Sequence, residues 1–242
     1  MPQMSAPFLS IIIPVYDEAE SLVELVRRCR EAAVRTGHAY EMILVDDASQ
    51  DTTPEVMARI DNHVGLSVLR LKSNKGQIAA TMEGLRVAKG RIVLVLDGDL
   101  QDPPEVIPEL VHVLEQAPSD VGVVFAVKVP LGGPAWFRLG HFVHSMLLAR
   151  LSGKRLPIGA GSFCALRAAT VERLVRRNAR WGNLSAVIAA QDVRWLAVPY
   201  HKEERYHGQS RVGALGLIVE SVASLMIVAA GFLRSSRNGR AP

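Results

Sequence analysis

Cysteines and aromatic residues are scarce in this sequence of 242 residues. Its two cysteines, Cys29 and Cys164, are too few for a disulfide framework or a zinc cluster, and such usage is typical of a reducing cytosol. No segment repeats at a fixed period, which excludes solenoids and propellers. Residues 1–10 have no positive stretch followed by a long apolar run, so we expect no signal peptide. A hydrophobic content of 49% excludes wholesale disorder and is enough for a full core.

The net charge of +4 is unevenly distributed along the chain. Residues 1–120 carry 11 Lys and Arg against 19 Asp and Glu, whereas residues 121–242 carry 17 against 5. An acidic half suits the chemistry of cations, and a basic half suits phosphate groups or an anionic membrane surface. A well-solvated basic surface also fits the second half, so charge alone leaves both interpretations open.

Short apolar runs and helical patterns alternate through the first half of the chain. Strands are predicted at residues 10–15, 40–45, 66–71, 91–96 and 121–127, and helices at about 19–36, 53–62, 77–89 and from Pro104 onward. This order predicts an α/β fold with a mostly parallel, doubly wound sheet, whose ligands bind beyond the carboxyl ends of the strands. The alternation weakens in the second half, where we predict a loop at residues 157–162, a helix at 168–177 and a strand at 192–198.

Acidic residues stand at the carboxyl end of the fourth predicted strand. Asp97 and Asp99 flank Gly98, and two carboxylates at this spacing can share one hard cation with a diphosphate. Gln101 adds a neutral oxygen on the same side. An ordinary turn also fits, because Asp-Gly is common turn chemistry and Asp102 precedes two prolines that open a helix. The location at the end of a central strand favours the metal site.

A second acidic pair, Asp46-Asp47, ends the second predicted strand. Acidic residues that follow strands hydrogen-bond a ribose or a base in nucleotide-binding folds. An Asx turn with Ser49, together with Asp51 as the cap of the next helix, explains the same residues. The two interpretations are compatible with each other.

Two further loops are candidates for nucleotide or anion binding. At the end of the first strand, Pro14 fixes a turn, Tyr16 offers a ring on which a base can stack, and Glu18 offers an acceptor. An ordinary strand-to-helix loop fits these residues equally. The segment Asn74-Lys75-Gly76-Gln77 precedes a helix N-terminus, where anions bind favourably. It matches neither a Walker A loop nor a dinucleotide fingerprint, which disfavours those classes.

The basic half contains a segment suited to phosphate. Arg205 and Arg211 flank a glycine in an otherwise extended stretch, and guanidinium groups pair bidentately with phosphate oxygens. Such groups offset the negative charge that develops on a diphosphate leaving group. A solvated basic loop is the alternative. Three histidines of this half lack metal-ligand spacing: His141, His144 and His201.

Four motifs, in this order and at about this spacing, resemble those of family 2 glycosyltransferases. They are Pro14-Val15-Tyr16-x-Glu18, Val45-Asp46-Asp47-x-Ser49-x-Asp51, Asn74-x-Gly76-Gln77, and the stretch from Leu96 to Glu105 that contains Asp97-Gly98-Asp99. Arg205-x-x-Gly208-x-Ser210-Arg211 resembles a further signature of the branch that glycosylates polyprenyl phosphates. That branch includes dolichyl-phosphate mannose synthase and bacterial undecaprenyl-phosphate sugar transferases. The combination of motifs is far more specific than any one of them.

The resemblance implies a fold of the glycosyltransferase A type, with a single nucleotide-sugar-binding α/β domain over residues 1–211. It implies transfer of a sugar from a GDP- or UDP-sugar to a polyprenyl phosphate, with inversion. Mg²⁺ or Mn²⁺ would be held by Asp97, Asp99 and Gln101, and the implied catalytic residues are Asp99, Arg205 and Arg211. The implied contacts to the nucleotide sugar are Pro14, Tyr16, Glu18, Val45, Asp46, Asp47, Gly76, Gln77, Asp97, Gly98 and Lys128. Lys128 and the two arginines would grip phosphates.

Several positions depart from the family pattern, two of them near the acceptor side. An acidic residue and an arginine near the acceptor side are replaced here by Ile158 and Cys164. A phosphate acceptor has its second pKa near ~6 and is largely an anion at neutral pH, so its attack needs no general base. Transfer to a sugar hydroxyl would need such a base and is the alternative reaction. A catalytically silent nucleotide- or lipid-binding relative and a receiver-like signalling domain with Mg²⁺ are the alternatives from other classes.

Residues 212–233 form a nearly continuous apolar segment of 22 residues. This length suffices for the ~20 residues of a membrane span, but Glu220 near the middle opposes insertion. A stripe of small and polar residues lies opposite an apolar one, which favours a helix in the membrane interface or packed on a partner, including a second copy. The basic tail, residues 234–242, suits anionic headgroups, so we expect association with the cytoplasmic face of the cell membrane. A buried core helix is the alternative.

Overall fold

The computed structural model describes residues 7–60, 65–129, 156–157, 159–177, 182–191, 193–201 and 226. The strands are β1 (Leu9–Val15), β2 (Tyr40–Asp46), β3 (Leu66–Arg70), β4 (Ile92–Val95), β5 (Val121–Val129), β6 (Ala160–Arg167) and β7 (Arg194–His201). The helices are α1 (Ala19–Arg35), α2 (Thr53–Ile60), α3 (Gln77–Val87), the 3-10 helix η1 (Pro104–Val106), α4 (Ile107–Gln116), α6 (Ala168–Arg177) and α7 (Leu184–Ala189).

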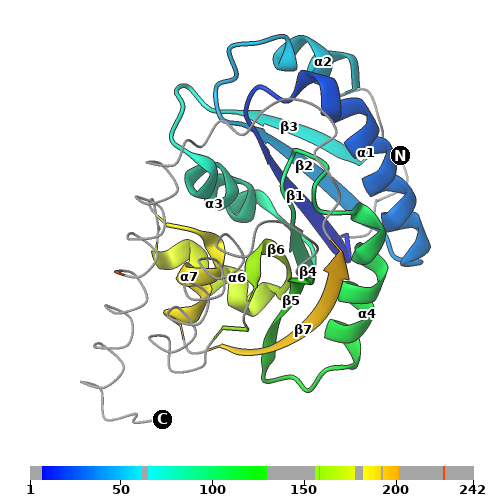
Figure 1. Ribbon diagram of the computed structural model, residues 1–242, viewed down its shortest axis with the longest axis vertical. Coiled ribbons are helices and arrows are strands. Elements are labelled where there is room, and N and C mark those ends of the chain that lie inside the picture. Colours follow the sequence, from blue (N-terminus) through cyan, green and yellow to red (C-terminus); the bar gives the residue numbers. More distant parts are fainter. Residues whose placement is uncertain are drawn as a thin grey trace, which may run out of the picture.

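The seven strands form a sheet in the order β3-β2-β1-β4-β6-β5-β7 (Figure 1). Strand β6 runs antiparallel to β4 and β5, and the other neighbouring pairs are parallel. The prediction of a mostly parallel α/β fold is therefore confirmed, and the strands and helices of the first half lie within a few residues of their predicted bounds.

The antiparallel strand corrects the sequence analysis. We predicted a loop at residues 157–162, but β6 begins at Ala160 and pairs with β4 from Ile92 to Val95. Its first residues, Ala160, Gly161 and Ser162, are small and typical of loops, and pairing with two neighbouring strands overrides this local preference. Helix α7 was not predicted, and β7 extends three residues beyond the predicted end of its strand.

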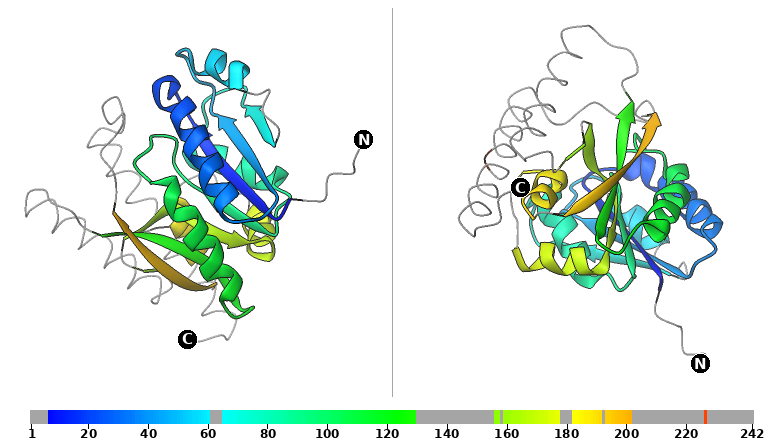
Figure 2. Two further views of the ribbon diagram at one scale, coloured as in Figure 1. Left: turned by 90° about the vertical axis from the view of Figure 1, so that its right-hand side faces the viewer. Right: turned by 90° about the horizontal axis from the view of Figure 1, so that it is seen from below.

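Helices cover both faces of the sheet. Figures 1 and 2 show α1, α2 and α4 on one side, with α3, α6 and α7 on the other. Successive residues of β1 alternate between these layers: Ile11 and Ile13 belong to the core beneath α1 and α4, whereas Ile12 belongs to the core beneath α3. All three are fully buried. This arrangement explains why the strand reads as a continuous apolar run, as expected for a parallel strand with two covered faces.

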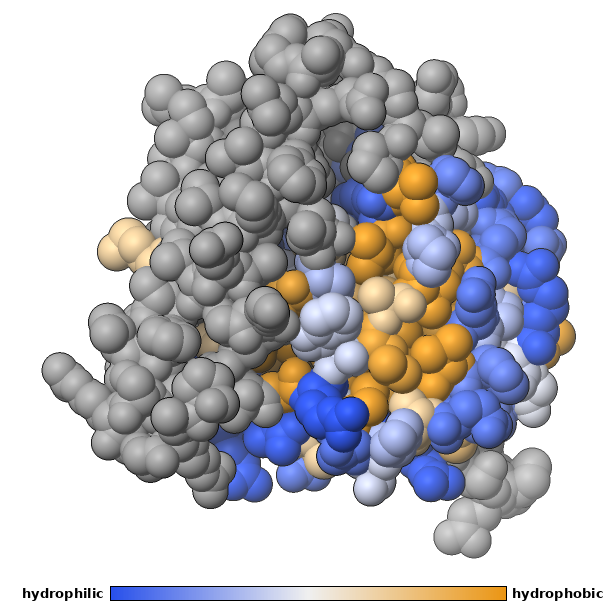
Figure 3. Space-filling view, turned by 60° about the horizontal axis from the view of Figure 1, so that its bottom comes forward, coloured by the Kyte–Doolittle hydropathy of each residue, from blue (hydrophilic) through white to orange (hydrophobic). Residues whose placement is uncertain are grey.

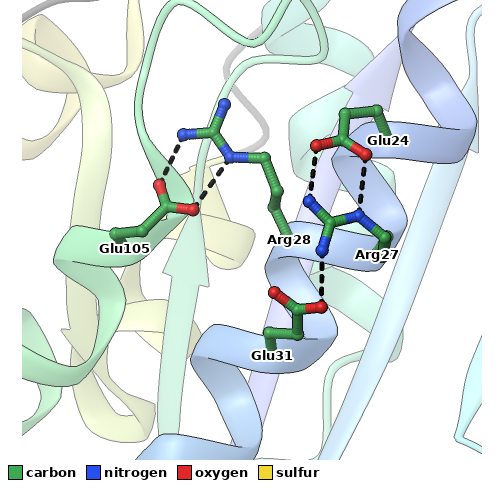
Figure 4. A network of polar contacts seen from close by, with 5 residues as sticks. All are labelled: Glu24, Arg27, Arg28, Glu31 and Glu105. Carbon is green, nitrogen blue, oxygen red and sulfur yellow. Dashed lines mark hydrogen bonds and ion pairs between the residues drawn. The ribbon is translucent and has the colours of Figure 1, made fainter.

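A charged network on α1 fixes the segment that follows β4 (Figure 4). Arg28 donates from Nε to Oε1 of Glu105 at 2.8 Å and from Nη2 to Oε2 at 2.5 Å. Nearby, Arg27 bridges Glu24 and Glu31 along the exposed side of the helix. The bidentate pair joins α1 to η1 and so anchors the chain just after Asp97-Gly98-Asp99.

An apolar surface lies on the side of the molecule that carries β7, bordered by hydrophilic residues (Figure 3). Strand β7 ends the sheet, and its Leu196 is 37% exposed. Among the described helices, none combines the length and apolar character that a membrane crossing requires. Apart from Met226, residues 212–233 lie outside the described residues, so the predicted C-terminal helix and the domain boundary at residue 211 stay predictions.

Candidate active site

The acidic loops converge at one edge of the sheet, where β1, β2 and β4 end. Val15 is the register partner of Asp46, and the N–H of Asp47 donates to the carbonyl oxygen of Val15 at 2.9 Å. On the other side of β1, the N–H of Leu96 donates to the carbonyl oxygen of Ile12 at 3.2 Å. The carboxyl ends of these parallel strands therefore bring the three predicted acidic loops together, as the sequence analysis expected.

The loop after β1 is locked onto the loop after β2. The N–H of Asp17 donates to Oγ of Ser49 at 2.9 Å, and the N–H of Glu18 donates to Oγ1 of Thr53 at 2.9 Å. Oδ1 of Asp17 accepts the N–H of Gln50 at 2.6 Å. Asp17 has a φ of 51°, a left-handed conformation that Asp tolerates better than most residues. These contacts hold the backbone that carries Tyr16 and Glu18.

Asp46 is fully buried, and both of its carboxylate oxygens contact other groups of the protein. Its Oδ1 accepts the N–H of Ser49 at 2.8 Å, and its Oδ2 lies 3.2 Å from Nε of Arg70. Oδ1 of Asp51 accepts the N–H of Thr53 at 2.9 Å at the start of α2. The predicted Asx turn and helix cap are thus present. The role of Asp46 toward a nucleotide stays a prediction.

Asp47 fastens the loop before α3. Its two carboxylate oxygens accept the backbone N–H groups of Lys75 and Gly76, each at 2.7 Å. Burial raises the pKa of Asp47, and the two N–H donors act in the opposite direction. Gly76 has a φ of 87°, which favours glycine. The amides that we expected to meet an anion before this helix therefore bind the protein's own carboxylate.

Asp97 is the centre of the site. Its Oδ1 accepts hydrogen bonds of 2.6 Å from Nε2 of Gln77 and from Oγ of Ser162. Burial and the negative charge of Asp102 raise the pKa of Asp97 to about 6, although the hydrogen bond from Ser162 and the charge of Lys128 act against this. The positive charge near Asp97 therefore does not balance its burial and the neighbouring negative charge, as expected of a carboxylate that binds a cation.

The two residues after Asp97 keep the turn close to β1. A Cβ atom on Gly98 would lie 3.1 Å from the carbonyl oxygen of Pro14, so a larger residue would crowd the backbone there. The carbonyl oxygen of Gly98 accepts the hydroxyl of Ser21 at 3.1 Å. Oδ1 of Asp99 accepts the N–H of Gln101 at 3.1 Å, which ties the predicted metal ligands Asp99 and Gln101 together.

Other predicted site residues lie on later strands or outside the described residues. Lys128 is at the end of β5, with Nζ 3.9 Å from Oδ1 of Asp102. Cys164, which stands where the family has arginine, is fully buried in β6 opposite Val95 and Phe125. Arg205, Arg211 and Ile158 fall outside the described residues.

Three residues that shape the site were not predicted from the sequence. They are Arg70, which pairs with Asp46, Ser162, which bonds to Asp97, and Tyr200, whose hydroxyl donates to Asp102. Ser162 lay in a stretch that we read as a loop. Each contact joins segments that are distant in the sequence, so no local sequence pattern predicts it.

Comparison with a protein family identifies the chain. The family described as "Glycosyl transferase family 2" matches residues 10–175, from β1 into α6. The chain belongs to glycosyl transferase family 2. This confirms the resemblance drawn from the motifs, and the acidic edge described above lies largely within the matched part of this family 2 chain.

The names of curated relatives of this family 2 chain include a lipid phosphate, undecaprenyl phosphate. An undecaprenyl-phosphate 4-deoxy-4-formamido-L-arabinose transferase from Edwardsiella ictaluri (strain 93-146) is 33% identical over 215 residues, which are 87% of this chain and 65% of the relative. A protein of the same name from Salmonella paratyphi B is 33% identical over 214 residues, 87% of this chain and 64% of the relative. The family 2 chain thus spans a little less than two thirds of the length of these relatives.

Solved glycosyltransferases share the fold of this family 2 chain. A mannosyltransferase from Pyrobaculum calidifontis in complex with GDP-Man and Mn²⁺ has a TM-score of 0.62 at 22% identity, covering 99% of this chain and 78% of that one. The glucosyl-3-phosphoglycerate synthase of Mycobacterium tuberculosis, in complex with Mn²⁺, UDP and phosphoglyceric acid, has a TM-score of 0.68 at 17% identity, covering 93% and 78%. The expected glycosyltransferase A-type fold is therefore confirmed.

Proposed function

We propose that this chain transfers a sugar from a nucleotide diphosphate sugar to a polyprenyl phosphate. Its family and the names of its relatives, which act on undecaprenyl phosphate, support this reaction. The observation that carries the proposal is the position of Asp97, which Gln77 and Ser162 hold at the edge where the acidic loops of β1 and β2 also end. Ligands of open α/β sheets bind at such an edge, so a nucleotide sugar would lie there.

The side chains after β4 suit a divalent cation. Asp97 and Asp99 offer carboxylate oxygens and Gln101 offers an amide oxygen, and hard oxygen ligands favour Mg²⁺ or Mn²⁺. Across the described residues, no three His, Cys, Asp or Glu side chains form a metal cage by themselves. We therefore propose that diphosphate oxygens of the donor complete the ligand set. When bound, the cation would stabilise negative charge on the departing diphosphate.

In the proposed reaction an oxygen of the acceptor phosphate attacks the anomeric carbon of the sugar. The new carbon–oxygen bond forms while the bond from that carbon to the diphosphate oxygen breaks, so a single displacement inverts the configuration. The acceptor phosphate has a second pKa near ~6, so the chain need not remove a proton from it at neutral pH. The chain must instead hold two anions together, and Lys128, with Arg205 and Arg211, would supply the positive charge.

A transfer assay on the full chain tests this function. Farnesyl phosphate is the acceptor, a panel of UDP- and GDP-sugars supplies the donor, and Mn²⁺ or Mg²⁺ is added. We expect release of UDP or GDP that depends on the acceptor, and a glycosylated farnesyl phosphate in the mass spectrum. Farnesol, which carries a hydroxyl instead of the phosphate, is the matched control. Equal transfer to farnesol would favour the hydroxyl reaction, and background turnover with every donor would favour a silent relative.

We also propose that the chain acts at the cytoplasmic face of the membrane. Its proposed acceptor is a lipid, residues 212–233 are apolar, and Arg234, Arg237 and Arg240 follow them. The full chain should co-sediment with vesicles that contain anionic lipid, and a chain truncated after Arg211 should co-sediment with them to a smaller extent. Equal partitioning of the two proteins would exclude this role for the segment.

A further inference from the structure

Three side chains from separate segments meet beside the candidate active site. They are Asp102 in the loop after β4, Lys128 at the end of β5 and Tyr200 near the end of β7. The hydroxyl of Tyr200 donates a hydrogen bond to Oδ1 of Asp102, and Nζ of Lys128 lies 3.9 Å from the same oxygen. The proposed function gives Lys128 a phosphate to bind, but it gives no role to Asp102 or Tyr200.

The sheet itself brings Lys128 and Tyr200 together. They are register partners in the parallel pair of β5 and β7, and paired residues of neighbouring strands point to the same face. Tyr200 is 3% exposed, and its ring packs edge-on against Phe163 of β6, with centroids 5.6 Å apart. Burial and the charge of Asp102 raise the pKa of Tyr200, so its hydroxyl stays protonated and can donate.

Asp102 is a buried carboxylate with few partners. It is 1% exposed, and no donor among the described residues makes a hydrogen bond to its Oδ2. Buried carboxylates usually accept several hydrogen bonds or pair with a cation, because an uncompensated charge is costly away from water. The loop that carries it also holds Leu100 at a φ of 59°, a conformation that is unfavourable for leucine. Holding Asp102 at this position therefore lowers the free energy of unfolding of the protein.

Lys128 can reach a ligand while Asp102 holds it. Its side chain is 28% exposed, whereas that of Asp102 is 2% exposed. A Cβ atom on Gly161 would lie 3.7 Å from Nζ of Lys128, an ordinary van der Waals distance, so Gly161 lies directly beside the ammonium group. The ammonium group lies near the acidic edge of the sheet, because Gly161 beside it precedes Ser162, whose hydroxyl donates to Asp97.

We infer that Asp102 and Tyr200 are positioning residues for Lys128. The hydroxyl of Tyr200 orients the carboxylate of Asp102, and this carboxylate holds the ammonium group of Lys128 beside Asp97, where the donor diphosphate is proposed to bind. The inference rests on the proposed function, since it assigns a diphosphate to Lys128. It predicts that Tyr200, which is buried, affects nucleotide binding only through Lys128.

A double-mutant cycle tests this inference by binding rather than by turnover. Calorimetry measures the Kd of UDP and of GDP, each with Mn²⁺, for the full chain and for Tyr200→Phe, Lys128→Met and the double variant. We expect Tyr200→Phe to raise the Kd by about tenfold in the wild-type background, the effect of losing one hydrogen bond to a charged group. In the Lys128→Met background, the same substitution should leave the Kd unchanged. Tyr40→Phe, at the start of β2 and far along that strand from Asp46, is the matched control.

The outcomes separate positioning from simple stabilisation. An equal factor for Tyr200→Phe in both backgrounds would overturn the inference, and so would an unchanged Kd for Tyr200→Phe or for Lys128→Met. If Tyr200→Phe does not fold, Asp102→Asn takes its place in the same cycle, and Lys128→Arg should recover most of the affinity that Lys128→Met loses. A wild-type chain that binds nucleotide but transfers no sugar would refute the proposed function and leave this cycle interpretable.

Discussion

The hydroxyl of Ser162 donates a hydrogen bond of 2.6 Å to Oδ1 of Asp97, a residue 65 positions earlier in the chain. Ser162 belongs to β6, the strand that runs antiparallel between β4 and β5. The same carboxylate oxygen accepts Nε2 of Gln77 from α3. Hydrogen bonds to a charged acceptor are short and directional, so together they fix the orientation of the carboxylate. The antiparallel strand thus contributes directly to the site.

Replacing Ser162 by alanine should lower kcat/KM for the nucleotide sugar about three- to tenfold, because Asp97 loses one of the two donors that orient it. The hydrogen bond from Ser162 also lowers the pKa of Asp97, so this pKa should rise in the variant. Steady-state kinetics measure the loss. Ser67→Ala, on the exposed side of β3, is the control and should behave as wild type. A Ser162→Ala variant with unchanged kcat/KM would contradict the assigned orientation.

The first half of the fold was predictable from the sequence because its signals are local. The apolar run of β1 is buried on both faces, and α1 has the predicted apolar stripe that includes Leu22, Leu25 and Cys29. Strand β6 was not predictable, because the small residues at its start resemble a loop and its pairing partners lie more than 30 residues away in sequence. Pairing between distant segments, rather than local preference, decides its structure.

The site was predictable in part for the same reason. Parallel strands carry their following residues to one edge, so the convergence of Asp46, Asp47 and Asp97 follows from the strand order alone. The partners of these carboxylates do not follow from it. Arg70 reaches Asp46 from β3, and Tyr200 reaches Asp102 from β7, through side-chain contacts that no spacing encodes.

Gly84 of α3 is predicted to tolerate no side chain. A Cβ atom there would lie 2.4 Å from Cγ2 of Ile12 and 3.1 Å from Cγ2 of Val45, and both residues are fully buried. Gly84→Ala should therefore lower the free energy of unfolding by about 1–3 kcal/mol, although alanine favours a helix by about 1 kcal/mol over glycine. Urea unfolding measures the change.

Gly76→Ala separates crowding from backbone strain in the same experiment. Gly76 has a φ of 87°, and among the described residues other than its two chain neighbours, no atom lies within 4 Å of the position that its Cβ would take. Its ψ of 157° places it in a backbone region that essentially only glycine adopts, so its substitution should cost about 1–3 kcal/mol through conformation alone. A Gly84→Ala variant as stable as wild type would show that α3 can shift away from β1 without loss.

The pair between Arg28 and Glu105 should make stability depend on pH (Figure 4). The hydrogen bond from Arg28 lowers the pKa of Glu105 below its ordinary value of 4.5. A carboxyl whose pKa is lower in the folded state adds stability above its unfolded pKa and loses it as the pH falls through the folded value. Because Glu105 is 43% exposed and solvent screens the pair, Glu105→Gln should lower the free energy of unfolding by about 0.5–1 kcal/mol at neutral pH.

The same difference should vanish once the pH lies below the lowered pKa of Glu105 in the folded state, where Glu105 is protonated in both states of the wild type. Urea unfolding at the two pH values measures it, with Glu55→Gln on the exposed side of α2 as the control for loss of a surface charge. A difference between Glu105→Gln and wild type that stays constant with pH would refute the ion pair as its cause.

Removal of Asp99 should separate metal binding from folding. Mn²⁺ together with UDP or GDP should raise the Tm of the wild-type chain, because a ligand at 100 times its Kd adds about 2.7 kcal/mol of stability, and EDTA should reverse the rise. Asp99→Asn should keep its Tm without ligand but show little or no rise with them, since one of the proposed metal oxygens is gone. Asp120→Asn, which removes an exposed carboxylate paired with Arg194 before β5 begins, is the matched control and should respond as wild type. Equal rises in Tm for Asp99→Asn and wild type would mean that the cation binds elsewhere in the protein.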